Sequence, residues 1–278
     1  MDAPSEAWRR LLADPAGPDL WRGALLVARE EGGGLDDASA DAALGDLAAR
    51  ISERLARPDA RGDRTGAFLH ALFVGEGFSG SDGDPFDPRD SDVRAVLARR
   101  RGLPIALATI ALALAARCAV PLHGIGFPGR YLLGAVIDGR ACAFDPVEGG
   151  RLVEEDELAA RAAAHAGGET PDAATLARLL APASARGTLL RMLRNLKAGH
   201  VAREDWAAVL RICDRQLLLA PDLPEALRDR GLAWLELGQG QRAAEDLERY
   251  LARHPEADGA QALGRALEQA RRSRVRLH

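Results

Sequence analysis

The sequence predicts an α+β protein, in which a helix-rich first half with a small antiparallel sheet is followed by an all-helical repeat module. Three observations predict this class. A nearly apolar run begins at Pro104 and is typical of a buried helix. Short strand-like stretches follow it, with Asp138-Gly139 as a two-residue hairpin turn. From about residue 190 the chain repeats with a period of about 34 residues.

The composition is that of a folded protein in a reducing compartment. The 278 residues are 47% hydrophobic and 28% charged, which is enough apolar material for one large or two moderate cores. The net charge of −4 favours neither nucleic acid nor a membrane surface as a partner. The three cysteines have no metal-type spacing, and residues 1–12 lack the apolar core of a signal peptide. We therefore expect a cytoplasmic protein without a metal or other cofactor, and its oligomeric state stays open.

The first elements are helices. Residues 5–60 carry helical periodicity, and the clearest helix runs from about Asp41 to Leu55. A short helix over Thr65–Phe73 is expected to end near Gly75. The stretch Gly77–Pro88 is rich in glycine, aspartate and proline, so it is predicted to be a loop.

Near residue 100 one helix is expected to give way to the next. Ser91 suits the N-cap of a helix that runs to Arg101, and Gly102 suits its end. Pro104 suits the first turn of the following helix, which runs to about Cys118 and is almost entirely apolar. This second helix is therefore predicted to be central and buried.

Three short strands are expected next. They cover Leu122–Phe127, Tyr131–Ile137 and Arg140–Phe144. A helix is expected again after Gly149-Gly150. Residues Ala162–Pro171 contain a glycine pair and a proline, so they are predicted to be a linker.

The repeat pattern is clearest in the unit that starts at Pro224. Small and aromatic residues then fall where the tetratricopeptide helix-turn-helix pattern has them, at Gly231, Trp234, Gly238, Ala243, Leu247 and Pro255. One period earlier the match is weaker, at Leu193, Leu196, His200, Val209, Cys213 and Pro221. A capping helix is expected over Ala260–Arg272.

Several motifs along the chain occur in the order that one family has them. They are Asp87-Pro88-Arg89-Asp90-Ser91, Val96-Leu97, Arg100 to Ile105, Phe127-Pro128-Gly129, Phe144-Asp145-Pro146, Gly149-Gly150, Leu193 to Lys197 and Arg228 to Gly231. From about residue 65 to 255 the chain resembles the bacterial invasion-regulator-type family, in which a transglutaminase-like domain precedes tetratricopeptide-like repeats. Two residues depart from that family, which usually has asparagine where Asp90 stands and histidine where Arg130 stands.

The resemblance implies a helix-rich transglutaminase-like core with a small antiparallel sheet, followed by an all-α tetratricopeptide-like module. The expected division is a helical segment over 1–64, a degenerate transglutaminase-like core over 65–161, a linker and helix over 162–189, two repeats over 190–257, and a capping helix and tail over 258–278.

The catalytic positions of that core are degenerate. Active transglutaminase-like enzymes place a cysteine at the N-terminus of a buried helix, where the helix dipole favours the thiolate. Counting back from Pro121, which fits the family's turn proline, places Pro104 at the nucleophile position. Arg130 occupies the histidine position and has no basic lone pair to offer, so only Asp145 matches the third member. The resemblance thus implies no catalytic residue.

The other cysteines and histidines do not replace the missing groups. Cys118 lies near the C-terminal end of its helix, Cys142 faces the opposite side of its strand from Asp145, and Cys213 lies in the repeats. We expect all three thiols to be small core residues. His123 reads as a structural histidine, and the remaining histidines show no metal-ligand spacing.

Two surfaces are candidates for binding. Asp87, Arg89, Asp90, Arg130 and Asp145 lie in or beside the former catalytic cleft. They either contact a substrate or peptide, or they shape the loop and tie Arg130 to Asp145 where the triad once stood.

The second surface is the expected inner face of the repeats, formed by Arg191, Arg194, Asn195, Arg228 and Leu232. Its arginines suit a carboxylate of an acidic protein or peptide partner. The alternative is that they are solvated, pair with Glu225 and Asp229, or dock against the first domain.

The sequence therefore predicts a non-catalytic protein- or peptide-binding regulatory protein. One alternative is an atypical, cysteine-independent amide hydrolase or acyl transferase that uses the retained cleft. A third interpretation is that the core only stabilises the repeats.

Overall fold

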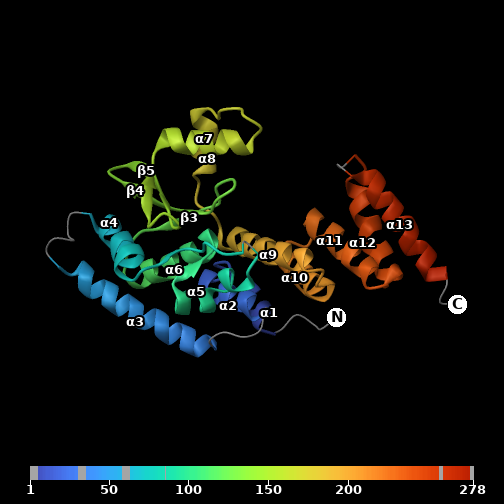
Figure 1. The fold of residues 1–278 in the computed structure, drawn as a ribbon, viewed down its shortest axis with the longest axis horizontal. Coiled ribbons are helices and arrows are strands. Elements are labelled where there is room, and N and C mark those ends of the chain that lie inside the picture. Colours follow the sequence, from blue (N-terminus) through green and yellow to red (C-terminus); the bar gives the residue numbers. More distant parts are fainter. Residues whose placement is uncertain (1–5, 31–35, 58–62, 85, 257–258, 276–278) are drawn as a thin grey trace. The chain divides into compact units, whose positions relative to one another are not determined.

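The apolar helix α6 (Pro104–Arg117) forms the centre of the first of two units in the computed structural model (Figure 1). The structure describes residues 6–30, 36–57, 63–84, 86–256 and 259–275. Leu103 is the N-cap residue of α6, Pro104 is its first residue, and most of its side chains are buried, as predicted. Helices α2 (Leu20–Arg29), α3 (Asp37–Leu55) and α5 (Val93–Arg99) pack against it together with the sheet.

The N-terminal helices are capped by aspartates. Helix α1 (Glu6–Leu12) packs on α2, whose first turn is capped by the Asp19 carboxylate. Helix α3 begins at Asp37, earlier than the predicted Asp41, because Asp36 accepts a hydrogen bond from the Ser39 amide at 2.9 Å. Its burial repeats on one face, which is the face that packs on α5 and α6.

The next short helix continues into a wider turn. Helix α4 (Arg64–Leu69) runs directly into the π-helical turn η2 (His70–Gly75), so the predicted end near Gly75 is confirmed. The following loop contains the two-residue strand β1 (Ser79–Gly80) and the 3₁₀ turn η3 (Pro88–Asp90). Strand β1 was not predicted, because it is short and its partner is distant in the sequence.

The junction near residue 100 differs from the prediction in two details. Asp92, and not Ser91, caps α5, because its carboxylate accepts the Arg94 amide at 2.8 Å. Arg100 ends α5 in the left-handed conformation, with a φ of 63°. Gly102 is thereby free to form strand β2 (Arg101–Gly102), which pairs in parallel with β1.

The sheet has four antiparallel strands in the order β3-β4-β5-β6. Strands β3 (His123–Ile125), β4 (Leu132–Ile137) and β5 (Arg140–Asp145) match the predicted ones. Asp138 and Gly139 have φ values of 50° and 76°, which confirms the tight hairpin between β4 and β5.

A helix follows Gly149-Gly150 as predicted, but strand β6 (Arg151–Val153), which was not predicted, comes first. Helix α7 (Glu155–His165) then extends into the predicted linker, which leaves only a short loop before α8 (Ala173–Leu179). Both helices cover one face of the sheet around Leu158 and Leu176.

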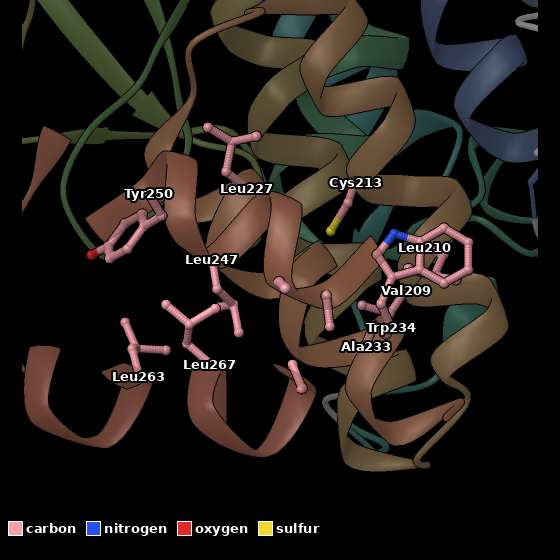
Figure 2. Close-up of a cluster of buried hydrophobic side chains, with 13 residues drawn as sticks. Val209, Leu210, Cys213, Leu227, Ala233, Trp234, Leu247, Tyr250, Leu263 and Leu267 are labelled. Carbon is pink, nitrogen blue, oxygen red and sulfur yellow. The ribbon is translucent and has the colours of Figure 1, made fainter. Parts of the chain in front are cut away.

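The second unit, from Leu193 onward, is all helical. Helix α9 (Ala185–Ala202) leads into it, and the helices α10 (Trp206–Leu219), α11 (Pro224–Glu236), α12 (Gly240–Arg253) and α13 (Ala260–Val275) follow. Consecutive helices pack against each other, α10 on α11, α11 on α12, and α12 on α13. Figure 2 shows their shared core, in which Cys213, Trp234 and Leu247 are buried. A Cβ atom on Gly231 would lie 2.8 Å from Leu247 Cγ, which explains the small residue at this repeat position.

Among the described residues, none of the helices combines the length and the apolar character that crossing a lipid bilayer requires.

Candidate functional site

The candidate site consists of the positions that the family resemblance assigns to a catalytic triad: Pro104 for the nucleophile, Arg130 for the histidine and Asp145 for the aspartate. At its nucleophile position, Pro104 opens α6. The Leu103 amide donates a 2.8 Å hydrogen bond to the Asp90 carbonyl, which fixes the chain just before the helix. The next residues, Ile105 and Ala106, are buried and apolar. The first turn of α6 therefore offers no side-chain nucleophile.

Arg130 and Asp145, at the other two triad positions, bind each other. The Arg130 guanidinium lies 2.8 Å from the Asp145 carboxylate, which is 0% exposed. Arg161, on α7, donates to the same oxygen at 2.8 Å. The second carboxylate oxygen accepts the Val147 amide at 3.0 Å. The carboxylate at the predicted aspartate position is thus held by two guanidinium groups.

Further charges extend this ion cluster to the protein surface. Glu148 pairs with Arg130 and Arg161 at 3.3 and 3.2 Å. Glu157 pairs with Arg161 at 2.5 Å and with Arg151 at 2.9 Å. Three arginines and three carboxylates therefore alternate around the end of β5 and the start of α7. Because the positive and negative charges of the cluster balance, we interpret it as an ion-pair network that stabilises the fold.

The electrostatics of the cluster keep its carboxylates ionised. Burial acts to raise the pKa of Asp145, but hydrogen bonds from Arg161 and Arg130 outweigh it and hold the pKa below its usual value. Hydrogen bonds from Arg151 lower the pKa of Glu157 to about 2. Carboxylates with lowered pKa values are weak bases at neutral pH, so neither suits general acid–base catalysis.

The fold brings the former nucleophile and aspartate positions to the two sides of β1. Gly80 pairs with Gly102, two residues before Pro104. A Cβ atom on Gly80 would collide with Val147, which follows Asp145 by two residues. The predicted nucleophile and aspartate positions therefore lie beside the same short strand.

The loop that includes Asp87, Arg89 and Asp90 is held by its own pairs. Arg89 forms a bidentate contact with Asp87, at 2.7 and 3.0 Å. Asp90 is 2% exposed and pairs with Arg99 at 2.8 Å. Within the described part of the chain, these two aspartates do not hydrogen-bond to Arg130 or Asp145. The five predicted cleft residues thus form separate local pairs.

The three cysteines occupy structural environments. Cys118 is buried and contacts Ser52 Oγ and the Ala48 carbonyl oxygen at 3.4 and 3.6 Å. Burial raises the pKa of Cys213 to about 12, which keeps it a thiol. Cys142 is only half-buried, so the prediction of a core position is wrong for this thiol. It lies three residues from Asp145 on β5, so the two side chains leave opposite faces of the strand as predicted.

His123 and Cys142 also line an apolar groove of about 600 Å³ beside α8. The sequence did not predict this groove. Because His123 pairs with Gly134 and Gly134 with Ala143, the histidine and the Cys142 thiol leave the sheet on opposite faces. Burial lowers the pKa of His123. These two groups therefore do not form a catalytic pair.

The predicted inner-face residues of the repeats are engaged in contacts. Arg191 belongs to the first unit, where it donates to the Phe127 carbonyl at 2.8 Å and lies over the Tyr131 ring. Arg194 pairs with Glu225, and Arg228 pairs with Asp229 at 2.7 Å.

The remaining two predicted inner-face residues, Asn195 and Leu232, are partly buried. Lys197, which was not predicted, belongs to the same surface. Asn195 is half-buried, and Leu232 packs against the core of the second unit. Lys197, the only lysine in the sequence, is buried and pairs with Asp229 at 2.6 Å. That Lys197 is the only lysine of an arginine-rich chain is the one feature of the sequence that sets this residue apart.

Comparisons with known proteins agree with this architecture. A family model for the transglutaminase-like superfamily matches residues 38–194, and a tetratricopeptide repeat model matches residues 196–271. The chain is 37% identical to a UPF0162 protein of Xylella fastidiosa over 92% of this chain and 91% of that protein. It is 30% identical to a UPF0162 protein of Vibrio cholerae, over 71% and 72% of the two chains.

It is also 29% identical to protein SirB1 of Salmonella typhimurium, over 68% of this chain and 69% of that protein. These matches confirm the family resemblance and the domain order predicted from the sequence.

Proposed function

Because the chain belongs to the transglutaminase-like superfamily, within the UPF0162 family, we propose a function that uses this fold without its chemistry. The protein is a non-catalytic regulatory protein whose repeat module binds a protein or peptide partner. The observation that supports this most is the ion cluster at Asp145, because two arginines occupy the carboxylate that a catalytic histidine would need.

The proposed binding surface lies on α9 and α11 of the second unit. Arg194, Lys197 and Arg228 face the two carboxylates of Glu225 and Asp229, which leaves one positive charge in excess. Arg194 and Arg228 are also 49% and 41% exposed, so a ligand can reach their guanidinium groups. This charge and access support an acidic partner segment.

The remaining parts of the proposal concern domain boundaries and location. We retain the division into an N-terminal helical segment, a degenerate core, a linker, two repeats and a capping helix. We also propose that the protein acts in the cytoplasm. The three unpaired cysteines, two of them buried, support a reducing compartment.

Co-purification from a native lysate tests the proposed surface. We compare the unmodified chain with an Arg194→Ala/Arg228→Ala double variant. Arg191 is left intact, because it binds the Phe127 carbonyl inside the first unit. Arg253→Ala is the matched control, because this arginine is 51% exposed and pairs with Asp222 on the same unit.

The proposal predicts a stoichiometric partner that is captured by the unmodified chain and by the control, and is lost from the double variant. Equal capture by all three proteins would contradict the proposed surface. Turnover of an amide or ester substrate by the purified chain would contradict the non-catalytic role.

A further inference from the structure

A second cluster of arginines lies on the first unit and shares no residue with either surface described above. Arg50 and Arg54 on α3 and Arg100 at the end of α5 converge on one carboxylate, that of Glu76. The nearest nitrogen–oxygen distances are 2.9, 3.4 and 3.7 Å in that order. One resident carboxylate therefore serves three guanidinium groups.

The backbone holds this cluster in a defined geometry. The Glu76 amide closes the π-helical turn η2 by donating to the Ala71 carbonyl at 2.9 Å, and Arg54 donates to the same oxygen at 3.2 Å. Gly75 leaves room for Arg54, since a Cβ atom there would collide with the guanidinium. A π-helical turn is uncommon and is frequent at functional sites.

Arg100 is held by different means. Its left-handed backbone conformation, with a φ of 63°, directs the side chain over the Phe78 ring, 4.7 Å from the ring centroid. Its Nη1 atom is buried and has no hydrogen-bond partner among the described residues. Burial lowers the pKa of Arg100, which indicates a guanidinium that is incompletely compensated.

The charges of the cluster do not balance. Asp46 also acts on Arg50, so two carboxylates face three arginines. Glu76 is only 9% exposed, whereas Arg50, Arg54 and Arg100 are 46%, 38% and 30% exposed. All three arginine side chains are thus partly open to solvent while Glu76 is nearly buried, so a second anion can approach the cluster from the solvent side. Val74, in the same π-helical turn, is an exposed apolar neighbour.

We propose that Arg50, Arg54 and Arg100 form a binding site for a second carboxylate, supplied by an acidic segment of a protein partner. The resident Glu76 illustrates the chemistry, because Arg50 already binds a carboxylate there through Nε and Nη2, at 3.3 and 2.9 Å. An exposed apolar residue beside charged groups suits a peptide chain better than a free inorganic anion. This site is independent of the surface on α9 and α11.

Fluorescence anisotropy with a labelled hexaglutamate peptide tests the site, using the full chain and two variants of opposite expected effect. Arg50→Gln/Arg100→Gln removes two of the three charges and leaves Arg54 to pair with Glu76. We expect about tenfold weaker binding of the peptide from the lost charge-assisted contacts. Glu76→Gln removes the resident carboxylate, and we expect tighter binding.

Arg29→Gln/Arg117→Gln is the matched control, because it also removes two charges, and both arginines are exposed and pair with aspartates on the same unit. The proposal expects no change in this control beyond about twofold. Thermal unfolding followed by circular dichroism checks that each variant is folded. If Glu76→Gln fails to fold, the double variant and its control still decide the question.

Equal weakening by the double variant and the control would overturn the proposal, since it would indicate only general charge attraction. Loss of peptide binding in Arg194→Ala/Arg228→Ala, with none in the Arg50/Arg100 variant, would overturn it while leaving the proposed function intact. Displacement of the peptide by inorganic phosphate, but not by acetate at equal ionic strength, would overturn the assignment to a carboxylate.

Discussion

Asp145, at the predicted aspartate position of a triad, makes ion pairs with two arginines. In a catalytic triad a carboxylate orients an imidazole. Here the histidine position carries Arg130, and Asp145 binds Arg130 and Arg161 in the interior of the first unit. The pair Arg130–Asp145 follows from the sequence, because both positions were assigned from motifs. Arg161 does not, because its helix reaches the cluster only through the packing of α7 beside β6 and the end of β5.

The tie at Asp145 predicts a loss of stability when an arginine is removed. Arg161→Ala leaves a buried carboxylate with one fewer donor, so we expect the free energy of unfolding to fall by about 1–3 kcal/mol in urea titrations. Arg130→Ala should act in the same direction. Arg89→Ala is the control, with an expected change within about 0.5 kcal/mol, because the Arg89 side chain is 70% exposed. A larger effect in the control than in Arg161→Ala would refute the tie.

The same residue predicts how stability depends on pH. The pKa of Asp145 is lower in the folded protein than its usual value of 3.8. Its ion pairs therefore contribute fully above about pH 5, and this contribution is lost as the pH falls through the folded-state pKa. In Asp145→Asn, the decrease of the urea midpoint from about pH 5 to pH 3 should be shallower than in the unmodified chain. Parallel pH profiles for the two proteins would show that Asp145 is not the titrating group.

Among the helices and strands, the prediction succeeds where a local sequence signal specifies the element and fails where the element depends on a partner distant in the sequence. Helix α6 and the Asp138-Gly139 turn were predicted because a proline, an apolar run and a two-residue turn specify them locally. Strand β6 was missed because only pairing with β5 defines its three residues. Gly149 and Gly150 both have positive φ values and form the turn into β6, and the predicted helix begins only after this strand.

The repeat pattern predicts a pair of glycine substitutions with opposite effects. In Gly231→Ala the new methyl group would lie 2.8 Å from Leu247 Cγ, inside the close packing of α11 on α12. We expect a loss of about 1–3 kcal/mol in the free energy of unfolding. Gly264 lies in α13 with nothing within 4 Å of its would-be Cβ, so Gly264→Ala should be neutral or stabilise by up to about 1 kcal/mol. Equal effects of the two substitutions in thermal melts would be inconsistent with this packing.

At the scale of the whole molecule, the order of a transglutaminase-like domain and tetratricopeptide repeats was predictable because dispersed motifs carry it. The binding surfaces were less predictable. Arg191 was assigned to the repeats, yet it binds Phe127 within the first unit. Lys197 and the arginines around Glu76 were not singled out, because their partners lie far away in the sequence.

The central claim is that the former catalytic centre stabilises the protein while the repeats bind its partner. Quantitative co-purification with Arg130→Ala and with Arg194→Ala/Arg228→Ala tests it most directly, at a temperature where both variants are folded. The account predicts that Arg130→Ala retains the partner in unchanged yield and that the double variant loses it. Loss of the partner from folded Arg130→Ala, with retention by the double variant, would contradict the account and assign binding to the former cleft.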